Sequence, residues 1–173
     1  MESDELKSEL IQKLEEWLYQ QHQIHLTQAR PLSKQERLRL DGYFEKRILD
    51  LTRVATIDQI PNPQFYDELR EREIPIPMDF TSAIGFTLID CVLLRKGFGS
   101  ISTLFHEMVH VVQADLLGVK RLLELYFSEL IKNGYQNVLF ERQAYDLTAR
   151  FTRGESFSVR EILEKEFSSL PNK

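Results

Sequence analysis

The sequence His106-Glu107-Met108-Val109-His110 places two imidazoles four residues apart, with a carboxylate directly after the first. On an α-helix, residues i and i+4 project from the same face, so both imidazoles can bind one metal ion. Neutral imidazoles are typical ligands of tetrahedral Zn²⁺, and this spacing favours zinc. Glu107 lies about 100° further round the helix than His106. It is therefore placed to take a proton from a water held by the metal, and not to bind the metal itself.

The segment that carries this motif is apolar nearly all round, which is typical of a central, buried helix. Its apolar residues are Phe105, Met108, Val109, Val111, Val112, Leu116 and Leu117. Its polar exceptions fall on one stripe and are Thr103, His106, His110 and Gln113. Buried polar groups need partners, and a metal ion would supply one for the histidines.

A catalytic zinc keeps three protein ligands and one open position, so a third ligand is needed. The only other histidines, His22 and His25, lie far upstream, which favours a carboxylate. The downstream candidates are Asp115, Glu124, Glu129, Glu141 and Asp146. We favour Glu141, because it borders the apolar stripe of a helix expected over 136–152 and has the small Ala144 one turn further on. Glu129 is the next choice.

An HExxH motif followed on a later helix by a glutamate resembles the gluzincin branch of the zincin metallopeptidases. The matching residues are His106, Glu107, His110 and the E-x-x-A unit from Glu141 to Ala144. The run HEMVHVVQ is also similar to small uncharacterised bacterial HExxH domains. The resemblance covers about residues 84–150. It implies a zinc-dependent peptidase that acts on a peptide or protein substrate, with Glu107 as general base.

The sequence departs from the thermolysin-like pattern shortly after Glu141. Thermolysin-like members carry E-x-x-x-D, in which the Asp supports a ligand histidine, whereas this chain has Tyr145 at that position and Asp146 one residue later. Asp115 is a weak substitute for that support. Hydrolysis of this kind also needs a group that stabilises the oxyanion. The candidates are Tyr66, Tyr135 and Tyr145.

Two other interpretations remain open at this stage. In the first, the fold is zincin-like but the metal is structural, so that the protein is a binding module; a structural site has no need of Glu107, which counts against it. In the second, the motif is a chance match in a helical adaptor. Measuring the metal content would distinguish the helical adaptor from the two metal-binding interpretations. Measuring the activity of a Glu107 variant would distinguish a peptidase from a binding module.

The elements around the motif predict a mainly helical α+β fold in a single domain over 1–173, with a helical part in 1–60 and a zincin-like core in 83–153. Helices are expected over 4–21, from Ser33 to about 55, and over 64–72, 101–117, 120–132, 136–152 and 158–169. Residues 83–95 are the one convincing strand region. By analogy with zincins, 83–94 would be the edge strand that binds an extended peptide.

The composition of the chain favours some classes of binding partner and some cellular compartments over others. The formal net charge of −5 argues against nucleic acid or an anionic membrane as the main partner. The sequence contains neither an apolar run of about 18 residues nor an N-terminal signal, so we expect a cytoplasmic protein without a membrane span. Cys91 lies in an apolar run and is expected to be a buried, inert thiol.

Overall fold

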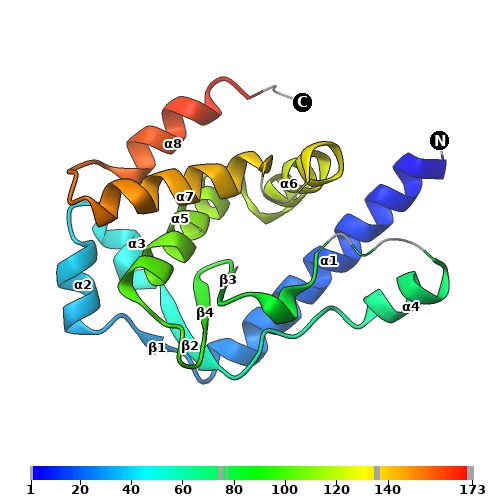
Figure 1. The fold of residues 1–173 in the computed structure, drawn as a ribbon, viewed down its shortest axis with the longest axis horizontal. Helices are drawn as coiled ribbons and strands as arrows, with labels where there is room; N and C mark the ends of the chain where they lie inside the picture. Colours follow the sequence, from blue (N-terminus) through cyan, green and yellow to red (C-terminus); the bar gives the residue numbers. More distant parts are fainter. Residues whose placement is uncertain (1, 74–75, 77, 135–136, 171–173) are drawn as a thin grey trace.

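The computed structural model describes residues 2–73, 76, 78–134 and 137–170 and has the predicted mainly helical α+β fold (Figure 1). Its helices are α1 (Glu2–Leu26), α2 (Lys34–Leu40), α3 (Lys46–Leu51), α4 (Phe65–Glu71), α5 (Ile101–Leu117), α6 (Val119–Asn133), α7 (Leu139–Thr152) and α8 (Val159–Phe167), with a 3-10 turn, η1, at Phe80–Ser82. Among these described helices, none is both long enough and apolar enough to cross a membrane.

The strands β1 (Arg30–Pro31), β2 (Arg53–Ile57), β3 (Gly85–Leu88) and β4 (Cys91–Arg95) form one sheet in the order β1-β2-β4-β3. The inner strands β2 and β4 run parallel, in a register that pairs Val54 with Val92. β3 runs antiparallel to β4, with Thr87 opposite Val92. Within this sheet β3 has a neighbour on one side only, so it is an edge strand, as the resemblance to zincins implies for the 83–94 region. The end of that region belongs to β4, which is an inner strand, so the prediction is wrong for residues 91–94.

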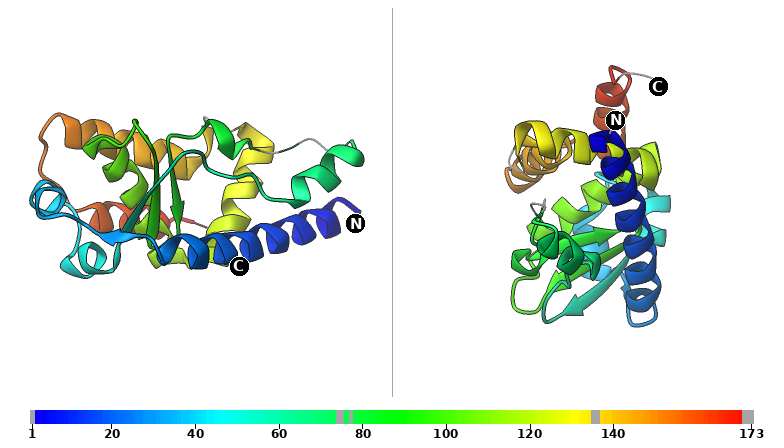
Figure 2. Two further views of the ribbon diagram at one scale, coloured as in Figure 1. Left: turned by 90° about the horizontal axis from the view of Figure 1, so that it is seen from below. Right: turned by 90° about the vertical axis from the view of Figure 1, so that its right-hand side faces the viewer.

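The sheet is covered by helices on both faces, and the alternation of β4 side chains shows which face each helix covers. Val92 and Leu94 point into the core that contains α5. Cys91 and Leu93 point into the core that contains α1. Figure 2 shows α1 running along the sheet on the side away from α7. Cys91 is fully buried, as predicted, and burial raises the pKa of its thiol to about 11.

The helix expected from Ser33 to about residue 55 is broken at residues 41–45, and its last residues, from 53 on, belong to a strand. Ser33 and Glu36 do form the predicted capping box at the start of α2. The helix then ends at Leu40, because Gly42 takes a positive φ of 83° that an L side chain rarely adopts. After the short helix α3, residues 53–57 pair with β4 as strand β2. Their β-branched side chains suit a strand buried between neighbours.

The single strand expected over 83–95 is a hairpin of two strands. β3 and β4 are joined by Ile89 and Asp90, and Ile89 takes a positive φ of 61°. A β-branched residue rarely adopts that conformation, so the sequence carries none of the usual two-residue turn signals. The hairpin turn is also tied to α1, where His22 Nε2 lies 2.5 Å from Asp90 Oδ1.

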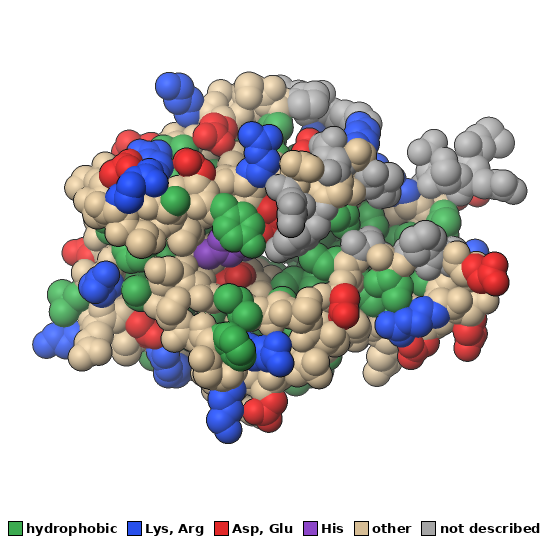
Figure 3. All heavy atoms as spheres, viewed as in Figure 1, with side chains coloured by type: hydrophobic (Ala, Val, Ile, Leu, Met, Phe, Trp, Pro, Cys, Tyr) green, Lys and Arg blue, Asp and Glu red, His purple; other side chains and the backbone are tan. Residues whose placement is uncertain are grey.

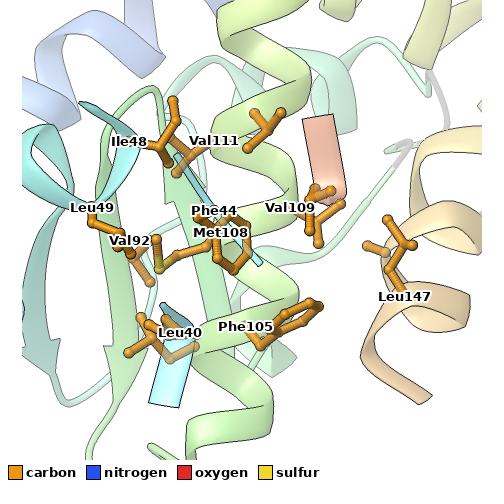
Figure 4. Packing of buried hydrophobic residues seen from close by; sticks show 14 of the residues in the cluster. Leu40, Phe44, Ile48, Leu49, Val92, Phe105, Met108, Val109, Val111 and Leu147 are labelled. Atoms are coloured by element: carbon orange, nitrogen blue, oxygen red, sulfur yellow. The ribbon is translucent and has the colours of Figure 1, made fainter. Parts of the chain in front are cut away.

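The motif helix α5 lies at the centre of the molecule and has the predicted bounds. The Ser100 hydroxyl accepts a hydrogen bond from the Thr103 amide at its start, and Gly118 follows its end with a φ of 76°. Figure 4 shows how Phe105, Met108 and Val109 pack against side chains from the N-terminal region, the sheet and α7. The helix is therefore held from several sides, which fixes the direction of its polar stripe.

Candidate metal centre

Two histidines of α5 and one glutamate of α7 converge in the structure. His106 Nε2 lies 3.5 Å from Glu141 Oε2, and His110 Nε2 lies 3.5 Å from Glu141 Oε1. The two imidazole Nε2 atoms are 3.3 Å apart. These are the three ligands predicted from the sequence, and among the described residues they form the one group of three or more that could hold a metal ion.

The separations of these atoms match a tetrahedral zinc site. With zinc–ligand bonds of about 2.0–2.1 Å, the corners of a tetrahedron are about 3.3 Å apart. The observed separations of 3.3, 3.5 and 3.5 Å lie within a few tenths of that value. Two imidazoles and one carboxylate are also the donor set that leaves a fourth position open for catalysis. The residues present therefore fit a zinc ion held by three protein ligands.

The carboxylate of Glu141 is buried and ionised. Burial alone would raise its pKa, but the nearby His110 and His106 and the Tyr126 hydroxyl lower that pKa to about 2. The Tyr126 hydroxyl donates a 3.0 Å hydrogen bond to Glu141 Oε1. Tyr126 thus holds the third candidate ligand from α6, a contact that the sequence did not point to.

Glu107 is buried beside the edge strand and makes no contact that would place it among the ligands. The Thr87 hydroxyl lies 2.8 Å from both Oε2 and the backbone oxygen of Glu107, and can donate to either. Burial raises the pKa of Glu107 to about 7, although His110 and the Thr87 hydrogen bond act in the opposite direction. A carboxylate with a pKa near neutrality is suited to take up and release protons.

Gly85 brings the edge strand into close contact with Glu107. A Cβ atom at this position would lie 2.6 Å from Glu107 Oε1 and 2.9 Å from its Cδ, closer than real Cβ contacts come. Gly85 and Thr87 therefore fix the carboxylate together, one by leaving room and one by a hydrogen bond. Neither role has a local signal in the sequence, since both depend on how the hairpin packs on α5.

These groups line a cavity of about 730 Å³, and the predicted polar stripe of α5 faces into it. Figure 3 shows histidine side chains at the bottom of a hollow on this face, with apolar side chains beside them. The cavity extends away from the metal centre between α1, α5 and α6. Its apolar wall includes Leu14, Leu18, Met78, Phe86, Leu122, Leu123 and Phe127. No lysine or arginine is among the described residues that line it.

The other carboxylates considered as ligands lie outside this group. Glu129 accepts a 3.3 Å hydrogen bond from the Leu139 amide at the start of α7. Asp115 pairs with Arg47 and Arg160, so it does not support a ligand histidine either. Glu124 lies 3.7 Å from Arg121. Asp146 is exposed on α7.

The three tyrosines considered for the oxyanion have different positions. Tyr145 lines the cavity, and its ring lies 4.6 Å from the His106 ring, centroid to centroid. Tyr66 also lines the cavity but is almost fully buried, and burial raises the pKa of its phenol. Tyr135 lies outside the described residues. Of the two that lie among the described residues, Tyr145 is thus the one placed against a candidate ligand.

Comparison with protein-family models gives no match, and neither does comparison with curated proteins or with solved structures.

Proposed function

We propose that this protein is a zinc-dependent metallopeptidase, with His106, His110 and Glu141 as metal ligands. The observation that carries the proposal is the convergence of these three side chains at tetrahedral separations, on the wall of a large cavity. A zinc ion held there would supply Lewis-acid chemistry, activating water and polarising a carbonyl.

In this proposal Glu107 is the general base. Its carboxylate accepts a proton from the attacking water and later donates one to the leaving amine, and its pKa of about 7 suits both steps. Thr87 and Gly85 hold it in place. Tyr145 is the candidate to stabilise the oxyanion, because its ring lies against His106 at the cavity wall.

The cavity favours a peptide substrate with apolar side chains. Apart from the metal centre its described wall is mostly apolar, and its acidic residues there are Asp79 and Glu107. An anionic group would meet no cationic partner there, whereas an apolar side chain would be desolvated favourably. The edge strand β3 supplies backbone groups beside the same cavity, as strand addition of an extended peptide requires.

A structural metal in a binding module is the second candidate. One observation favours it over an adaptor with a chance motif, namely the complete ligand group. Glu107 is buried and its pKa is raised, which counts against the binding module. Burying a carboxylate lowers the stability of the folded state, and a structural zinc makes no use of that carboxylate.

The substitution Glu107→Gln tests the proposal, because it keeps the size of the side chain but removes its ability to accept a proton. We expect one zinc per chain in both proteins by elemental analysis, and a loss of roughly 10²–10⁴-fold in turnover of a peptide library. Glu161→Gln, an exposed change of the same kind on α8, should keep full activity. A zinc-loaded wild type that cleaves no peptide would favour the binding module, and a wild type without zinc would refute both.

A further inference from the structure

A chain of hydrogen bonds leads from His110 through three helices to the C-terminal part of the molecule. His110 Nδ1 lies 2.7 Å from Gln113 Oε1. Gln113 Nε2 donates 3.0 Å hydrogen bonds to the Phe140 carbonyl and to Gln143 Oε1, both on α7. Gln143 Nε2 in turn donates to Glu166 Oε2 on α8, at 2.5 Å. None of the functions described above uses this chain.

The acceptors in this chain fix the direction of every hydrogen bond. The Phe140 carbonyl and the Glu166 carboxylate can only accept, so each glutamine must turn its NH₂ group towards them. The amide oxygen of Gln113 therefore faces His110. Since that oxygen cannot donate, His110 Nδ1 must carry the proton. The lone pair of neutral His110 then lies on Nε2, the atom that faces Glu141 and His106.

We propose that Gln113 is a positioning residue for the metal centre, which holds His110 in the tautomer that presents Nε2 to a metal. Gln143 and Glu166 complete the chain and hold Gln113 in its orientation. The inference rests on the proposed metal site, but it does not depend on whether the protein cleaves peptides. It also identifies a support for a ligand histidine where the sequence has Tyr145 in place of an Asp.

The two glutamines of this hydrogen-bonded chain are buried, which makes their hydrogen bonds important for the position of His110. Gln113 is fully buried and Gln143 is 7% exposed. A buried amide that loses its hydrogen-bond partners destabilises the folded state, so both side chains are held firmly in their observed pairing. Supports of this kind around a metal-binding histidine typically contribute 10–100-fold to metal affinity.

The first test is the tautomer of His110 in the zinc-free wild type. Long-range ¹H–¹⁵N correlation spectra of protein labelled at histidine distinguish the two neutral forms, recorded at about pH 8.5, where ordinary imidazoles are neutral. We expect a proton on Nδ1 of His110 and none on Nε2. A His110 ring that carries its proton on Nε2 would overturn the proposal without any variant having to fold.

The second test is zinc affinity measured by competition with a chromogenic chelator. Gln113→Leu keeps the approximate size of the side chain but removes the acceptor, and we expect its zinc Kd to rise about 10–100-fold. Gln143→Leu should raise it less, because the Phe140 carbonyl still orients Gln113. Glu161→Gln, on the same helix as Glu166, should leave it unchanged.

The melting curve of each zinc-free variant shows whether it folds. If Gln113→Leu does not fold, the proposal is tested by the zinc Kd of Gln143→Leu and by the tautomer of His110 in the wild type. A zinc Kd within twofold of wild type in folded Gln113→Leu would overturn the proposal, as would a wild type that binds no zinc. A wild type that is inactive on peptides, but loses zinc affinity in Gln113→Leu, would refute the peptidase and support the positioning role.

Discussion

Glu107 is the residue on which the proposed chemistry depends most, and its surroundings leave it little freedom. Thr87 holds one carboxylate oxygen, and the missing side chain of Gly85 leaves room for the other. The two residues belong to the same strand, so the position of β3 relative to α5 sets the position of the general base. A change on β3 can thus alter catalysis without touching a metal ligand.

We predict that Gly85→Ala lowers turnover while zinc is retained. The added Cβ meets Glu107 Oε1 at 2.6 Å, so the carboxylate must move, and a shift of about 1 Å can cost on the order of 10²-fold in rate. Overpacking should also lower the free energy of unfolding by about 1–3 kcal/mol. Peptide turnover, zinc content and urea unfolding measure the three quantities.

Gly99→Ala is the matched control for this substitution. The nearest atom to a Cβ there is Leu94 Cδ1 at 3.4 Å, an ordinary contact. We expect wild-type turnover in this variant. Equal losses in both variants would mean that the effect is general destabilisation of the hairpin region and not displacement of Glu107.

At the scale of single residues, the sequence predicted those site residues whose positions follow from the spacing within one helix. His106, Glu107 and His110 needed only helical periodicity, and Glu141 needed the apolar stripe of α7. Thr87 and Tyr126 could not be found in this way, because their contacts with Glu107 and Glu141 cross between elements far apart in the sequence. Their residue types are common and carry no signal without the fold.

At the scale of elements, β3 decides how a substrate could bind. Arg95 donates its amide hydrogen to the Ile84 carbonyl, so the alternate residues Phe86 and Leu88 also bond towards β4. The backbone groups of Gly85 and Thr87 then point to the other side, and both residues line the cavity. An added peptide strand would pair with these two residues.

We predict that a cleavable peptide loses binding when the amides that pair with Gly85 and Thr87 are methylated. Methylation removes an N–H donor, so affinity should fall at alternate positions along the peptide and not at every position. Binding of a series of singly N-methylated peptides to zinc-loaded Glu107→Gln, measured by calorimetry, reports this pattern without turnover. Uniform effects along the series would exclude strand addition.

The elements whose start and end signals lie within their own residues were predicted correctly from the sequence. Those that depend on partners far away in the sequence were predicted wrongly. The motif helix has both its cap and its terminating glycine in the sequence, so its bounds are correct. The expected helix extends to about residue 55 and so overlaps the start of β2, because the partner that makes residues 53–57 a strand, β4, lies almost 40 residues further on. The hairpin turn was missed because Ile89 replaces the usual glycine or asparagine.

For the molecule as a whole, the proposed metal would link α5 to α7 and so stabilise the folded state. We predict that free zinc at about 100 times its Kd adds about 2.7 kcal/mol, since zinc binds the folded chain preferentially. For a chain of this size, that corresponds to a rise in Tm of roughly 5–10 °C. Calorimetry with and without a chelator measures it.

His106→Ala should abolish this rise, because it removes one ligand. His22→Ala is the control, since His22 contacts Asp90 at the hairpin turn and lies outside the ligand group. This variant should melt lower in both conditions but keep the same difference between them. A zinc effect that survives in His106→Ala would place the bound metal elsewhere in the molecule.

The central position of α5 also affects how the chain folds while it is being synthesised. Phe105 stacks on Phe151 at 4.3 Å between centroids, and Val109 packs with Leu147, so α5 is covered in part by residues synthesised after it. A ribosome that has released residues 101–117 but not α7 holds an apolar helix with one face exposed, a state prone to aggregation. Glu141 belongs to α7 itself, so the three candidate ligands come together only when α7 packs on α5. Zinc capture would therefore follow the packing of α7 on α5, and would mark a chain in which the apolar face of α5 is already covered.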